Sequence, residues 1–133
     1  EDPKKNPTKR VGWWSPSQHF SMVYVGYSLW NQYQRHNDDG LLQDAIDISQ
    51  SAYERFAGEL DDSDRDNFTI VANLKNSLCY YLAEQEANGI PVPPEARKLA
   101  LAFAIEIENA MSILWDFAGE FSDTIQYVRS KLS

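Results

Sequence analysis

The apolar spacing of this chain restricts its fold more than any other feature, because it is helical almost from end to end. Apolar residues recur every three or four positions, and no stretch alternates apolar and polar residues as a half-buried strand does. Such spacing gives each helix an apolar face that another helix must cover. The sequence therefore predicts an all-α protein.

Turn and capping signals divide this pattern into segments. Ser15 to Gln18 predicts a helix start, since Pro16 suits the first helical position. Residues 37–40 predict a turn whose acids cap the next helix, and Gly58 lies in a second break. Each segment should bury one face. The expected faces are Phe20, Val23, Tyr27 and Trp30; Leu42, Ala45, Ile46, Ser49, Ala52, Tyr53 and Phe56; Val71, Leu74, Leu78, Tyr81 and Leu82; Ala96, Leu99, Ala100, Phe103, Ala104 and Ile107; and Leu114, Phe117, Phe121, Ile125, Val128 and Leu132.

The later boundaries follow from similar signals. Ser63 to Asp66 has the spacing of a capping box, and Asn88-Gly89 should end the helix that it starts. Pro94 suits the first turn of the next helix, where residues 99–105 are apolar on every side. We expect that helix to be central in the fold. Residues 110–131 are compatible with one helix or with two, because Gly119 and Ser122 permit a break.

Composition limits the size and class of the protein. The 133 residues suffice for one domain, predicted over 15–133 after a basic, flexible arm at 1–14. A first residue that is not Met suggests an excerpt or a processed chain. One cysteine, Cys79, cannot form an intrachain disulfide, which favours the cytoplasm. The net charge of -8 argues against nucleic-acid binding.

A membrane segment is not expected. Residues 11–34 contain no Asp, Glu, Lys or Arg and would be long enough to span a bilayer. Ser, Gln, Asn, His, Pro and Gly interrupt this stretch throughout. The basic start is also followed by Trp13-Trp14-Ser15-Pro16 and not by the apolar run of a signal peptide.

No residue pattern predicts catalysis or a metal site. Asp62, Asp64 and Asp66 alternate as in a calcium loop, but Asn67 stands where the sharp turn needs Gly. Capping of the next helix is the better interpretation. His19 and His36 lack a ligand spacing, and Cys79 is interpreted as a buried structural thiol. Glu106 and Glu108 are two apart on a helix and cannot share a proton, so we interpret them as solvated. We expect no enzyme, no metal and no cofactor.

An internal repeat is visible in the helical pattern. Gly26 to Tyr33, followed by Leu42 and Ala45-Ile46, matches Asn76 to Ala83, followed by Ala96 and Ala100. A third, partial unit starts at Asp123. At these residues the chain resembles the tetratricopeptide (TPR) repeat family, from about Ser17 to the end. The unit here is longer than the family's repeat of about 34 residues, and its packing glycine is replaced by Trp30, Cys79 and Gln126.

The resemblance implies a short α-solenoid of antiparallel helical hairpins, with a five-helix bundle as the alternative. It also implies that the first helix of each unit lines a concave groove for a partner peptide or helix. Aromatic rings suit such a surface because they bury area at low entropy cost, and Asn can bond both groups of a peptide unit. The groove positions are Tyr24, Tyr27, Asn31, Gln34 and Arg35; Asn73, Asn76, Tyr80 and Glu84; and Asp123, Tyr127 and Lys131.

The predicted function is therefore protein binding by a bacterial, cytoplasmic interaction module or scaffold. Members of the family that grip a terminal carboxylate use Lys and Arg, and only Arg35 and Lys131 could do so here. The acidic chain instead favours a neutral or basic partner, attracted over long range. Two alternatives stay open: a helical bundle that holds a small ligand in an apolar pocket, and a homodimerisation module.

Overall fold

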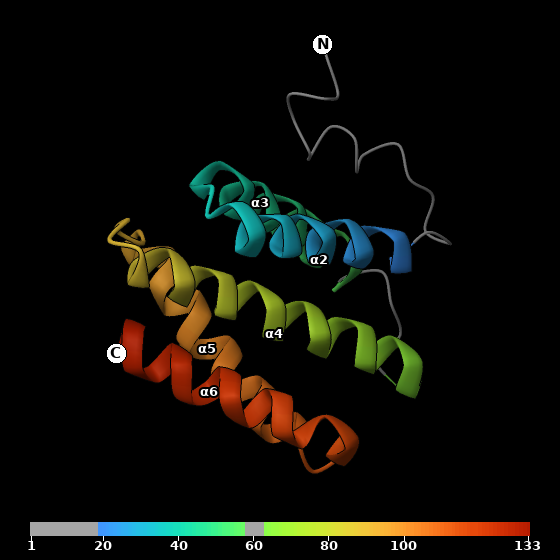
Figure 1. Ribbon diagram of the computed structural model, residues 1–133. Coiled ribbons are helices and arrows are strands. Elements are labelled where there is room, and N and C mark those ends of the chain that lie inside the picture. The colour runs from blue at the N-terminus through green and yellow to red at the C-terminus, as the bar shows by residue number, and fades with distance from the viewer. Residues whose placement is uncertain (1–18, 58–62) are drawn as a thin grey trace. The chain divides into compact units, whose positions relative to one another are not determined.

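The computed structural model describes residues 19–57 and 63–133, and within them every regular element is helical (Figure 1). This confirms the predicted all-α class. The elements are α2 (His19–His36), α3 (Asp39–Phe56), α4 (Arg65–Ala87), α5 (Pro94–Ala110), the 3-10 helix η3 (Trp115–Phe117) and α6 (Ala118–Leu132).

Several predictions concern residues outside this part of the chain. They are the arm at 1–14, the helix start at Ser15, the break at Gly58 and the loop position of Asp62. The side chains of His19 and Phe20 are likewise outside the description. These predictions stay predictions.

The chain divides into two compact units. The first ends at Leu60 and contains α2 and α3, and the second begins at Asp61 and contains α4, α5, η3 and α6. Each is described by itself. The single domain predicted over 15–133 stays a prediction.

The turn of the first unit forms as expected. After α2 ends at His36, Asn37 adopts a left-handed conformation with φ of 50°, which Asn tolerates better than most residues. Its amide donates to the Tyr33 carbonyl at 2.6 Å. Asp38 then caps α3 by accepting from the Gly40 amide at 2.8 Å. An acid of the predicted turn therefore starts the next helix.

Helices α2 and α3 form an antiparallel pair, and their backbones come close where small residues meet. A Cβ atom added to Gly26 would lie 3.1 Å from the Ser49 hydroxyl and 3.4 Å from Ile48. Buried positions on α3 follow the predicted face, except that Tyr53 is half-buried and Ile48 joins the core. They are Leu42, Ala45, Ile46, Ile48, Ser49, Ala52 and Phe56.

In the second unit, α4 is capped one residue later than predicted. Asp64, not Ser63, is the N-cap, and its carboxylate accepts from the amides of Asp66 and Asn67 at 2.8 and 3.3 Å. The capping-box prediction was wrong because Asp also caps well and here stands directly before the first helical residue. Asp66 in the first turn adds favourable charge near the positive end of the helix.

The end of α4 confirms the Asn88-Gly89 prediction. Gly89 has φ of +81°, its amide donates to the Glu86 carbonyl, and the Ile90 amide donates to the Gln85 carbonyl. These paired bonds around a left-handed glycine are a Schellman motif. The chain then passes through extended residues to Pro94, where α5 begins. Pro94 therefore has its predicted place in the first turn.

Residues 110–131 contain a break and not one continuous helix. Helix α5 ends at Ala110, a turn follows at Met111 to Leu114, and η3 leads into α6 at Ala118. The break thus lies before Gly119, which is already helical. Leu114 is buried within this turn, so apolar spacing continues through a segment that is not α-helical.

Helices α4, α5 and α6 all contact one another (Figure 1). Helix α5 is not covered on every side, because Ile105 is 54% exposed and Ala102 is also exposed. The expectation of a central helix was therefore wrong: three mutually packed helices each keep an outer face. The largest fully buried side chains of this unit are Phe103, Phe121, Leu78, Ile107, Leu114, Leu132, Val128 and Cys79.

Arg97 ties the ends of all three helices together. From the first turns of α5 its guanidinium donates to the Leu132 carbonyl, near the C-terminus of α6, at 2.9 Å. It also forms an ion pair with Glu86 in the last turn of α4. Arginine suits this place because its planar group can bond two acceptors in fixed directions.

No helix in the described part of the chain is long and apolar enough to cross a membrane.

Candidate functional site

The predicted groove residues lie on three helices. One set is on α2, in the first unit, and the other two sets are on α4 and α6, which pack against each other in the second unit. A surface shared by two of the three predicted sets can therefore be described.

The α2 set is largely exposed. Tyr24 is 72% exposed and Tyr27 is 56% exposed. Tyr27 was also expected on the buried face of its helix, and that expectation was wrong. The apolar stripe bends toward Trp30 and Tyr33, both buried, whose rings lie 5.3 Å apart between centroids. The remaining members, Asn31, Gln34 and Arg35, are half-buried or exposed.

The α4 and α6 sets meet through two tyrosines. The ring centroids of Tyr80 and Tyr127 are 4.8 Å apart, with an interplanar angle of 31°. The Tyr127 hydroxyl donates to the Glu84 carboxylate, one turn after Tyr80 on α4. Aromatic pairs at this separation attract each other beyond their shared burial. Tyr80 and Glu84, one turn apart on α4, and Tyr127 on α6 therefore lie side by side where the two helices contact each other. We call Tyr80, Glu84, Asp123, Tyr127 and Lys131 the tyrosine–carboxylate cluster.

The cluster is electrically negative around its rings. Burial raises the pKa of the Tyr80 phenol, and the negative charges of Glu84 and then Asp123 raise it further. Both carboxylates therefore act on one ring, although they come from different helices. Tyr80 and Glu84 are half-buried and Asp123 is exposed, so the carboxylates are within reach of solvent.

The cluster already holds one cation of the chain itself. The Lys131 ammonium lies over the Tyr127 ring, 6.0 Å from its centroid. That distance is at the outer limit of a cation–π interaction, which at an exposed site is worth about 0.5 to 1 kcal/mol. Lys131 is exposed on the last turn of α6. Its contact with the ring is therefore a weak one.

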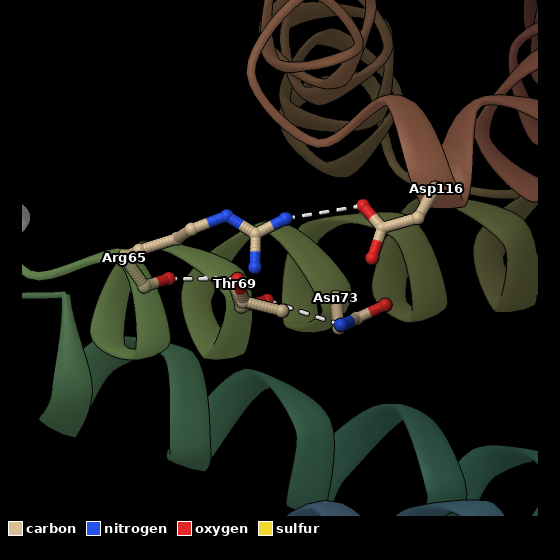
Figure 2. Close-up of polar contacts among 4 residues, drawn as sticks. All are labelled: Arg65, Thr69, Asn73 and Asp116. Atoms are coloured by element: carbon tan, nitrogen blue, oxygen red, sulfur yellow. Dashed lines mark hydrogen bonds and ion pairs between the residues drawn. The ribbon is translucent and has the colours of Figure 1, made fainter.

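The two asparagines of the α4 set differ in their bonding. The Asn73 amide donates to the Thr69 carbonyl at 3.1 Å, and the Thr69 hydroxyl donates to the Arg65 carbonyl at 2.7 Å (Figure 2). Asn73 is thus engaged by its own helix. In contrast, Asn76 Oδ1 is buried without a hydrogen-bond partner among the described residues. An unsatisfied buried acceptor of this kind lowers stability.

Figure 2 also shows an ion pair that sequence reasoning missed. Arg65 at the start of α4 lies 3.2 Å from Asp116 of η3, and both side chains are about half exposed. Arg65 and Asp116 are 51 positions apart. Helical spacing relates residues three or four apart, so no local signal could have identified this pair.

Glu106 and Glu108 each have a partner on a different helix. Glu106 lies 3.2 Å from Lys75 of α4, and Glu108 lies 3.3 Å from Arg129 of α6. Their predicted divergence on the helix is confirmed. The interpretation as simply solvated carboxylates was incomplete, because both side chains are about half exposed and paired. Such surface pairs contribute about 0 to 1 kcal/mol each.

Of the three acids that resemble a calcium loop, Asp64 is the helix cap and Asp66 lies in the first turn of α4. Among residues 19–57 and 63–133, no group of three or more His, Cys, Asp or Glu side chains is placed to hold a metal ion. His36 is exposed in the last turn of α2.

Cys79 is fully buried on α4, in agreement with its interpretation as a structural thiol. Its sulfur lies 3.5 Å from the Asn76 carbonyl. Burial raises the pKa of the Cys79 thiol from 9.0 to about 12, although local backbone hydrogen bonds oppose the shift. The nucleophilic thiolate is therefore nearly absent at neutral pH.

We expect Cys79 to resist alkylation by iodoacetamide at about pH 8 while the chain is folded, because neither access nor thiolate is available. The same chain in urea should react within minutes. The shift also predicts that stability falls as pH rises from 9.0 toward about 12, because only the unfolded thiol then loses its proton. Equal labelling rates for the folded and unfolded chain would contradict the described burial.

Two exposed apolar side chains near the end of α5 were not expected. Trp115 is 76% exposed and Ile113 is 54% exposed, both next to the break between α5 and α6. Apolar spacing alone does not predict this exposure, because Leu114, which lies between Ile113 and Trp115 in the chain, is buried. Comparison of the chain with protein-family models, with curated proteins and with solved structures finds no match.

Proposed function

We propose that this protein is a TPR-like interaction module that binds a segment of another protein across the face formed by α4 and α6. The observation that carries the proposal is the tyrosine–carboxylate cluster. Two aromatic rings 4.8 Å apart lie across a helix contact, with a carboxylate bonded to one of them. Tyrosines that are half-buried offer apolar area and a polar group together, which is typical of binding surfaces.

The arrangement of helices supports this proposal in a second way. In the family that the chain resembles, the first helix of one repeat packs beside the first helix of the next. Here α4 contains the repeat segment Asn76 to Ala83 and α6 contains the segment that starts at Asp123. The two helices contact each other directly. Both helices also have buried residues that pack in the core, so the two rings stand on a rigid support.

Replacing Tyr80 with alanine tests the proposal. The wild-type chain, immobilised on a support, should capture a specific partner from an extract of the cells that produce it. With the Tyr80→Ala chain, we expect the amount of that captured partner to fall at least about tenfold. Quantitative mass spectrometry measures the loss, and circular dichroism checks the fold. The reason is that a central aromatic anchor contributes more binding free energy than its neighbours.

Trp115→Ala is the matched control, because it also removes an aromatic side chain from the second unit, although Trp115 is exposed and Tyr80 is half-buried. It should leave the captured partner unchanged. If Trp115→Ala removes the partner and Tyr80→Ala does not, the binding surface is the α5–α6 turn and the proposal is wrong. Light scattering on both variants separates partner binding from self-association, since only the latter changes mass with concentration.

A further inference from the structure

The end of α4 contains an asparagine whose side chain is reactive when the backbone around it is open. Asn88 is the only asparagine of the sequence that is followed by glycine. Because Gly89 has no Cβ atom, its backbone nitrogen can approach the side-chain carbonyl carbon of Asn88 with little hindrance. Both residues are exposed, so water can reach the bonds concerned. This pair therefore has the chemistry needed for spontaneous deamidation.

The reaction needs only water as a co-reactant. The Gly89 nitrogen bonds to the side-chain carbonyl carbon of Asn88, and the bond from that carbon to the amide nitrogen breaks. Ammonia leaves with the proton that the Gly89 nitrogen gives up. Water then adds to one of the two carbonyl carbons of the cyclic imide and breaks its bond to the Gly89 nitrogen, which regains a proton. The product is aspartate or isoaspartate, and no group is oxidised or reduced.

The folded end of α4 opposes the first step of this reaction. Asn88 has ψ of 3°, which turns the Gly89 nitrogen away from the Asn88 side chain. The Gly89 amide also donates to the Glu86 carbonyl at 3.0 Å. Next to it, the Ile90 amide donates to the Gln85 carbonyl at 3.1 Å. Attack therefore requires rotation about ψ of Asn88 and loss of these bonds, which is a local opening of the helix end.

A contact between helices opposes this opening. Glu86, whose carbonyl accepts from the Gly89 amide, forms an ion pair with Arg97 of α5. Arg97 is held in turn by its hydrogen bond to the Leu132 carbonyl of α6 at 2.9 Å. The side chains of Arg97 and Glu86 are 34% and 25% exposed, so solvent screens their attraction only in part. Opening of the last turn of α4 must therefore work against this ion pair.

We propose that Asn88 is a deamidation site, and that the Arg97–Glu86 ion pair slows its modification by holding the end of α4 closed. The product adds a carboxylate one turn after Glu84, at the end of the helix that already has negative partial charge. Isoaspartate also lengthens the backbone before Gly89 and so displaces the bonding amides. Modification therefore leaves this helix end more open. The proposal concerns the end of α4 and does not depend on partner binding.

Incubation of the full chain in mildly alkaline buffer, with and without guanidinium chloride, tests the proposal. Peptide mapping by mass spectrometry measures the fraction of Asn88 that is converted. Asn88→Gln confirms the assignment, because glutamine forms the corresponding ring far more slowly. Asn88 should be converted at least about tenfold more slowly in the folded chain than in the unfolded chain. Equal rates, or no conversion of Asn88 in the unfolded chain, would overturn the proposal.

Matched variants test the role of the ion pair. Arg97→Gln removes the pair and should speed conversion in the folded chain about threefold. Glu86→Gln removes the same pair but keeps Arg97 beside the Leu132 carbonyl, so it replaces Arg97→Gln if that variant does not fold. Lys75→Gln is the control, because it removes a different ion pair between α4 and α5, with Glu106. Unchanged conversion in a folded variant without the Arg97–Glu86 pair, or equal acceleration by Lys75→Gln, would overturn the proposal.

Hydrogen exchange separates opening of the helix end from a loss of overall stability. In the Arg97→Gln chain the amides of Gly89 and Ile90 should exchange faster, whereas the amide of Leu78 within α4 should not change. Equal acceleration of all three amides would contradict a local role for the ion pair. Asn88→Asp reproduces one product and should also speed exchange of the Gly89 and Ile90 amides. Unchanged exchange in that variant would contradict the proposed opening of the helix end.

Discussion

Phe103→Ala is expected to lower the free energy of unfolding by about 3 to 5 kcal/mol, the largest effect among the variants considered. Phe103 is 2% exposed and belongs to the buried face of α5, together with Ala100, Ala104 and Ile107. Removing the ring loses its transfer free energy and leaves a cavity that three packed helices can close only in part. Chemical denaturation followed by circular dichroism at 222 nm, the usual helical band, measures the change.

Ile105→Ala is the control for this measurement. Ile105 is on the same helix, two positions away, and is 54% exposed. Its replacement should change stability by less than about 1 kcal/mol, since little apolar area returns to water and alanine is the better helix former. A loss below about 1 kcal/mol for Phe103→Ala would show that α5 contributes little to the core of the second unit.

Much of this fold was predictable because its determinants are local. Helical spacing identified the segments, and residues with special backbone preferences fixed several ends. Gly89 supports the left-handed end of α4, and Pro94 opens α5. The α4 cap shifted by one residue because Ser63 and Asp64 are both good capping residues, and sequence alone does not choose between them.

The errors arose where tertiary contacts decide. Residues 99–105 are apolar on every side, yet Ile105 is exposed, because a three-helix unit offers α5 only two neighbours. Leu114 has the spacing of a helical residue but is buried from a turn. Apolar periodicity predicts which residues are buried, but it does not predict whether the backbone remains helical between them.

The candidate site was predictable as a list of residues but not as a constellation. Family-like spacing placed Tyr80 and Glu84 on one helix and Tyr127 and Lys131 on another. Only the packing of α4 against α6 brings the two rings to 4.8 Å and directs the Tyr127 hydroxyl to Glu84. The electrostatic consequence follows from the same packing, since burial, and then the carboxylates of Glu84 and Asp123 from the two helices, raise the pKa of Tyr80. A charge count shows an acidic chain and does not locate its charges.

Ala45→Leu is expected to destabilise the chain by about 1 to 3 kcal/mol through overpacking in the α2–α3 pair. Ala45 is fully buried on α3, one turn before Ser49, which already lies 3.1 Å from the position of a Cβ on Gly26. A leucine adds volume at a fully buried position, so either its rotamer is strained or its neighbours must move apart. Gln50→Leu, exposed on the same helix, should change stability by less than about 0.5 kcal/mol. The melting temperatures of the Ala45→Leu and Gln50→Leu variants, measured by thermal denaturation, distinguish these two effects. An unchanged melting temperature for Ala45→Leu would mean that the α2–α3 contact does not require small residues and that the first unit tolerates a wider helix separation.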